Sequence, residues 1–180
     1  MKTLIIVIGF IAVAGVIASY YYNNRLSTQQ QPLAFRLDGS TPLRKTFPNI
    51  PIGTEVSVSM GVRPEREGVI FNTPPTGEFS GFPAPSTVKV ILAPDNTPVL
   101  IRAVSGGRVD RVASTKDIVT DGLFHVISVT LKNSTITFTV DGDEIGTLAY
   151  IGGWGPSTMI FGENGFVGDI RNVFINNSVV

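Results

Sequence analysis

Two hydrophobic patterns divide the chain at residue 32. Before it, residues 4–19 form an unbroken apolar run; after it, short apolar stretches alternate with glycine, proline and polar residues. The clearest stretch, 134–140, has a large apolar residue at every second position with threonines between them, which is the period of a strand with one buried face. Comparable stretches occur at 33–37, 55–60, 86–92, 98–104, 107–113 and 123–131. The pattern predicts an all-β sandwich over residues 33–180.

The N-terminal apolar run has the length of a membrane-spanning helix. With the three tyrosines that follow, it falls within the roughly 17–25 residues that such a helix needs, and tyrosines are typical of the membrane interface. We expect a single-pass anchor at 1–22 and a polar linker at 23–32. The anchor residues would include Leu4, Ile5, Ile6, Val7, Phe10, Tyr20, Tyr21 and Tyr22. A cleaved signal peptide is the alternative, because Val16 and Ala18 have the spacing of a cleavage site.

Turn signals separate the later stretches. Lys132–Ser134 predicts a hairpin turn, because Asn133 tolerates a left-handed backbone, and the Asp-Gly pair at 141–142 is favoured in such turns. The charged segment Pro64–Gly68 suggests a solvated turn. The long connection Asn72–Ser86 is rich in proline and glycine, and it predicts either a binding loop or a solvent-facing insertion.

Composition narrows the possible chemistry. The 14 acidic and 14 basic residues cancel, so no basic surface for nucleic acid is expected. Cysteine is absent, which excludes disulfides, thiolate zinc sites and a cysteine nucleophile. The single histidine, His125, shares the strand parity of Ile127 and Val129, and no second histidine can complete a dyad or a metal cluster. We therefore predict that His125 is structural, with no catalytic residue, metal or cofactor.

Acidic side chains gather at one turn. Asp141, Asp143 and Glu144 lie within four positions, but glycosidases need two carboxyl groups facing one cleft. We expect a solvated turn, with calcium binding as the alternative.

Five residues are candidates for contact with a partner. Trp154, in a Gly/Pro-rich loop, would either stack on a ligand or cover the end of the core. Phe79 and Phe82 lie in the long connection, and Arg108 and Arg111 could meet an acidic glycan or protein.

Two motifs resemble the laminin G domain family: DGLFHVISVTLKNSTITFTVDG at 121–142 and MIFGENGFVGDIRNVFIN at 159–176. The resemblance implies a laminin G-like, concanavalin-type jelly-roll sandwich, which serves mainly to bind glycans, proteins or steroids. Phe124 replaces the family's usual tryptophan, and Asp169 stands where a cysteine often follows. The family's calcium-binding acids cannot be placed on matching positions of this sequence, so the resemblance does not imply calcium here.

The second motif also predicts a local irregularity. Phe166, Gly168 and Ile170 share one parity, whereas Val173 and Ile175 share the other. Both sets can face one core only if a bulge intervenes near residues 171–172, and Gly168 would mark a close approach of another chain segment.

These inferences predict a non-catalytic, membrane-anchored module that tethers a bilayer to a protein partner or assembly. One such setting is the minor capsid layer above a virion's internal membrane. The first alternative is a glycan-binding adhesion protein at the cell surface or in the secretory pathway, where Asn133 and Asn176 would be glycosylation acceptors. The second is a glycan-cleaving enzyme.

Overall fold

The computed structural model describes residues 33–47, 55–74, 87–103, 108–150, 154–176 and 178–179. They belong to one compact unit, residues 32–180. Within this part of the chain no helix is long and apolar enough to cross a membrane. The expected anchor and linker, with Phe79 and Phe82, lie outside the described residues.

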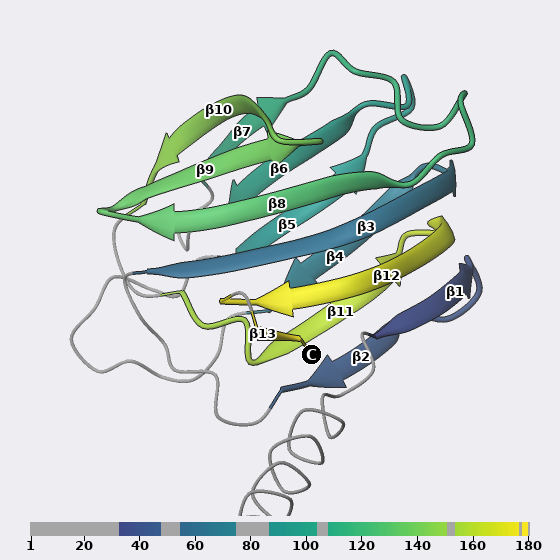
Figure 1. Ribbon diagram of the computed structural model, residues 1–180, viewed down its shortest axis with the longest axis horizontal. Helices are drawn as coiled ribbons and strands as arrows, with labels where there is room; N and C mark the ends of the chain where they lie inside the picture. Colours follow the sequence, from purple (N-terminus) through teal and green to yellow (C-terminus); the bar gives the residue numbers. More distant parts are fainter. Residues whose placement is uncertain are drawn as a thin grey trace, which may run out of the picture. The chain divides into compact units, whose positions relative to one another are not determined.

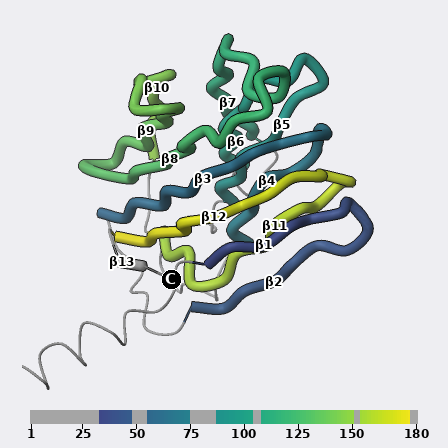
Figure 2. Tube along the Cα trace, turned by 45° about the vertical axis from the view of Figure 1, so that its right-hand side comes forward, coloured from purple at the N-terminus to yellow at the C-terminus, as the bar shows by residue number. Residues whose placement is uncertain are grey.

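The described strands form two antiparallel sheets (Figure 1). Sheet A contains, in spatial order, β1 (Ala34–Asp38), β12 (Val167–Ile175), β3 (Val56–Arg66), β8 (His125–Lys132), β9 (Thr135–Val140) and β10 (Asp143–Ala149), while β13 (Ser178–Val179) also pairs with β12. Sheet B contains β2 (Leu43–Thr46), β11 (Thr158–Glu163), β4 (Gly68–Thr73), β5 (Thr87–Leu92), β6 (Pro98–Ala103) and β7 (Val109–Ala113). Figure 2 shows β1 close to β2 on one side of the two layers.

The predicted sandwich is confirmed. The inner faces of both sheets supply a continuous core, which includes Leu37, Val58, Met60, Val62, Phe71, Val90, Leu100, Ile127, Val129, Phe138, Phe161 and Ile170. Alternation along each strand turns the remaining side chains outward, so the domain has two outer faces.

Several strands were not predicted, among them β2, β4, β10 and β13. The expected turn at Pro64–Gly68 is wrong, because β3 continues through Arg66 and β4 begins at Gly68. The long connection also starts later than expected, since Asn72 and Thr73 belong to β4. Residues 64–66 of β3 pair with β12, and β2 and β4 pair with β11; such distant partners leave little local signal.

Both predicted hairpin turns are confirmed. Asn133 and Ser134 have φ values of 49° and 58° between β8 and β9, and Asp141 and Gly142 have 54° and 88° between β9 and β10. Two successive left-handed residues match the right-handed twist of paired strands.

The predicted bulge in β12 is confirmed. Its register with β3 shifts between Arg171 and Phe174, and Asn172 has a φ of 52°. The shift lets Ile170 and Val173 both reach the core, where they are fully buried. Gly168 is closely packed as expected, because a Cβ there would lie 2.7 Å from the Arg63 carbonyl oxygen.

Candidate functional site

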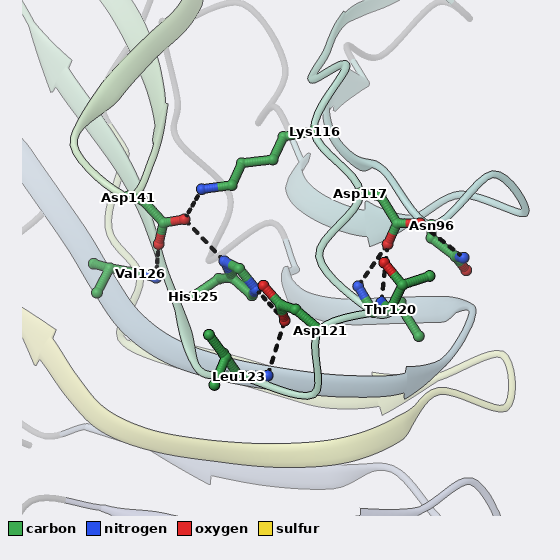
Figure 3. A network of polar contacts seen from close by, with 10 residues as sticks. Asn96, Lys116, Asp117, Thr120, Asp121, Leu123, His125, Val126 and Asp141 are labelled. Atoms are coloured by element: carbon green, nitrogen blue, oxygen red, sulfur yellow. Dashed lines mark hydrogen bonds and ion pairs between the residues drawn. The ribbon is translucent and has the colours of Figure 1, made fainter.

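His125 lies at the start of β8 between two carboxylates (Figure 3). Its Nδ1 is 2.8 Å from Asp141 Oδ2 and its Nε2 is 3.0 Å from Asp121 Oδ1. Asp141 also accepts hydrogen bonds from the Lys116 ammonium and, at 2.8 Å, from the Val126 amide. The side chain of His125 is 5 % exposed. Through its two contacts, His125 ties the β9–β10 turn to segment 114–124.

These contacts favour a charged imidazole. Burial lowers the pKa of His125, but the hydrogen bonds to Asp141 and Asp121 outweigh it and raise the pKa above 6.5. Burial raises the pKa of Asp141, yet hydrogen bonds from His125, Lys116 and Val126 bring it down to about 2. The imidazolium therefore donates from both nitrogens, one to each carboxylate.

The structural role of His125 stays a prediction, and two observations agree with it: both of its nitrogens are engaged by carboxylates and its side chain is buried. The turn at Asp141 and Gly142 is exposed as predicted, and Asp143 and Glu144 are exposed at the start of β10. Asp141 also belongs to the His125 network, which was not predicted. Among the described residues no group of three or more His, Asp or Glu side chains is arranged to hold a metal ion.

Segment 114–124 is held by this network through Lys116 and Asp121, and by hydrogen bonds from the Ser114 and Ile118 amides to the Pro98 and Asn96 carbonyl oxygens. Ile118 is fully buried, and the Asp117 carboxylate accepts hydrogen bonds from the amides of Val119 and Thr120 at 2.8 and 3.1 Å. Val119 and Gly122 of this segment, with Arg63, Pro64 and Glu65 at the end of β3, line a pocket of ≈ 440 Å³.

An aromatic platform lies next to this pocket. The Arg171 guanidinium carbon is 3.6 Å from the ring centroid of Phe124, and that of Arg63 is 5.1 Å from it. Gly61 pairs with Arg171 and Val126 on its two sides, and a Cβ there would lie 3.3 Å from Arg171 Cγ. The bare glycine therefore leaves room for Arg171 to cross β3 and stack on the ring.

Exposed apolar side chains flank Phe124 along the chain. Leu123 is 61 % exposed and Val126 is 50 % exposed. We call Leu123, Phe124, Val126, Arg63 and Arg171 the rim patch. Sequence analysis did not select these residues, although Phe124 and Val126 share the outward parity of β8, which was the available signal.

Trp154 does not serve as a surface contact. It is 3 % exposed, and its Nε1 donates a 3.0 Å hydrogen bond to Thr73 Oγ1, which in turn donates to the Val88 carbonyl oxygen at 2.8 Å. The structure thus matches the alternative in which the tryptophan covers the core, and we correct its selection as a partner-binding residue.

The two selected arginines have different surroundings. Arg108, whose side chain is 75 % exposed, forms a 3.0 Å ion pair with Asp110. Arg111 is exposed on β7, on the outer face of sheet B. Neither belongs to the rim patch.

The family model described as Laminin G domain matches residues 63–178, and the chain belongs to this family. No curated protein matches the chain.

Solved structures show the same fold at low sequence identity. The chain is 13 % identical to laminin α1 domains LG4-5 from mouse, with a TM-score of 0.63, and 12 % identical to the LG1-3 region of the laminin α2 chain, with a TM-score of 0.65. The matches cover 83 % and 84 % of this chain but 44 % and 32 % of those chains, so it spans less than half of either structure. A heptameric SAP-like pentraxin from Limulus polyphemus is 13 % identical, with a TM-score of 0.56 and coverage of 83 % and 78 %.

Proposed function

We propose that the chain is a non-catalytic binding module that joins a bilayer to a protein partner through the rim patch. The fold supports the binding part, because laminin G domains are generally non-enzymatic binding modules. The observation that carries the proposal is the Phe124 ring, which lies under two guanidinium groups and is flanked along the chain by the exposed Leu123 and Val126. Aromatic and arginine side chains dominate the binding energy of protein interfaces.

Residues 1–22 supply the membrane end of this proposed tether, and residues 23–32 the linker. Apolar length and interfacial tyrosines support the anchor. A virion with an internal membrane is one setting for such a tether, and detection of the protein only in cellular membranes would contradict that setting.

Photo-crosslinking tests the protein contact. The full chain would carry benzoylphenylalanine in place of Leu123, and irradiation would take place in the membrane or particle that contains it. Thr147, exposed on β10 of the same sheet, is the matched control position. We expect adducts to one abundant protein from position 123 and few from position 147. Leu123→Glu should then lower binding of that protein at least tenfold, while Leu123→Met should preserve it.

The second candidate is glycan binding, and a separate surface favours it. Hydroxyl side chains line up in register across the outer face of sheet A, in the rows Ser57–Thr130–Thr137–Thr147 and Ser59–Ser128–Thr139. Such donors and acceptors suit an uncharged sugar. Retention of the protein on immobilised neutral glycans, with loss of binding in Thr137→Val and no specific adduct from position 123, would replace the first proposal by this one.

A further inference from the structure

The outer face of sheet B carries a row of residues that crosses all six strands. Register places one residue of each strand in it: Arg44, Ile160, Asn72, Lys89, Ile101 and Arg111. The neighbours of this row along the central strands, such as Met159, Val88 and Leu100, are fully buried. Strand alternation therefore turns the row away from the core.

The three cations of this row have no anionic partner among the described residues. Every described ion pair involves other residues, and Arg44, Lys89 and Arg111 take part in none. Glu163 lies close by on β11, where its carboxylate accepts a 2.9 Å hydrogen bond from Asn72 Nδ2. The described residues of this face thus carry an excess of positive charge.

Apolar side chains alternate with these cations. Ile160 and Ile101 are half-buried within the row, and Ile91 is half-buried on the neighbouring row. At the sheet edge, Val109 on β7 is 59 % exposed and shares the outward parity of Arg111. A surface of cations and aliphatic groups matches a ligand surface that is anionic and amphipathic.

The spacing of the cations favours a lipid surface over a protein as the partner. At about 4.8 Å per strand, Arg44 and Lys89 are roughly 14 Å apart, and Lys89 and Arg111 roughly 10 Å. A protein would need carboxylates fixed at these intervals, whereas anionic lipid headgroups diffuse to each cation in turn. The proposed linker of residues 23–32 can span at most about 36 Å, which would keep the domain near the bilayer.

We propose that the outer face of sheet B rests on an anionic bilayer surface. Arg44, Lys89 and Arg111 contact the headgroups, and Ile101 and Ile160 face the interfacial region. The inference rests on the proposed membrane anchor for the nearness of the lipid, but the lipid-facing surface has its own evidence in the row of cations.

The absence of cysteine from the chain allows a single-label test. Ile101→Cys on sheet B and Thr137→Cys on sheet A are matched, because both residues are half-buried on the outer faces of inner strands. The full chain, labelled with a nitrobenzoxadiazole dye, would be reconstituted into vesicles of phosphatidylcholine with or without 30 % phosphatidylserine (roughly the anionic fraction that gives a negative surface potential). A headgroup nitroxide quenches dyes that lie at the lipid surface.

With phosphatidylserine, we expect quenching at position 101 to be at least two-fold stronger than at position 137. The difference should disappear in 1 M NaCl, where the Debye length is about 3 Å, and in the variant R44Q/K89Q/R111Q. The variant R44K/R111K, which keeps the charge, should retain it. Equal quenching at both positions, or a difference that persists in pure phosphatidylcholine, would overturn the proposal.

Flotation after an alkaline carbonate wash separates this proposal from the anchor. A chain that floats with the vesicles after the wash but shows equal quenching retains the anchor and overturns the bilayer-facing surface. A chain that the wash removes, but that shows stronger quenching at position 101 before the wash, lacks the anchor and supports the surface.

Discussion

Charged side chains form ion pairs on the outer face of sheet A, whereas cations on the outer face of sheet B have no ion pair among the described residues. On sheet A, Asp169 lies between Arg63 and Arg36, at 2.5 and 3.3 Å, and Arg36 also pairs with Glu65 at 2.6 Å. On sheet B, the described cations Arg44, Lys89 and Arg111 have no such partner. Charges paired across strands stabilise the fold that holds them, whereas unpaired charges add little to stability and remain available to an external anion.

The largest expected effect concerns the support of the sheet A face. His125→Ala removes the cation between Asp121 and Asp141 and should lower the free energy of unfolding by about 3 kcal/mol, measured by urea denaturation. It should also reduce crosslinking from position 123, because Asp121, two residues before it, loses its partner on β8. Vesicle contact by sheet B should persist. Lys132→Ala, which breaks an exposed pair with Glu55, should change stability by less than about 0.5 kcal/mol and is the control.

The same network predicts a bounded pH range of stability. Because folding raises the pKa of His125, its contribution is present below pH 6.5 and is lost as pH rises through the folded value. Folding lowers the pKa of Asp141 from 3.8 to about 2, so its contribution, roughly 2 kcal/mol, is lost as pH falls through that range. The high-pH decline should be absent in His125→Ala, and an unchanged profile in that variant would contradict the assignment.

The next largest expected effect on stability comes from removing one charge from the outer face of each sheet. Asp169→Asn leaves Arg36 and Arg63 side by side without their shared carboxylate, and should cost about 1–2 kcal/mol of stability. Lys89→Gln on sheet B should change stability by less than about 0.5 kcal/mol, since no ion pair is lost. Equal losses in the two variants would mean that the sheet B face also depends on its charges for folding.

The smallest expected effect sharpens the description of the rim patch. Gly61→Ala places a Cβ about 3.3 Å from Arg171 Cγ and should weaken the stacking of Arg171 on Phe124, at a cost of about 0.5–1 kcal/mol. Crosslinking from position 123 should fall in this variant. Ser59→Ala, on the same face of β3, should leave both quantities unchanged.

Local pattern was sufficient for much of the fold. Alternation identified β9, the left-handed turns at Asn133 and Asp141 followed from residue type, and the change of parity in β12 located its bulge. Each of these features depends on neighbouring residues, so the sequence contains the whole signal.

The candidate surfaces were harder to predict. Trp154 was selected for contact, yet a hydrogen bond to Thr73, 81 positions away, helps to hold it in the core. Phe124 was noted only as the residue that stands in place of the family's usual tryptophan, because its partner Arg171 comes from another strand. Of the five selected residues, Arg111 lies on a surface now proposed to bind, and Phe79 and Phe82 stay predictions.

The sequence determined the strand period, the tight turns and the laminin G family. Tertiary structure decided which charges meet: Arg36 with Asp169 across β1 and β12, and Arg44, Lys89 and Arg111 in one row without a counter-charge among the described residues. The physical reason is register. Pairing between strands distant in sequence sets the neighbours on each outer face, and a shift of one residue would exchange the two faces of a strand.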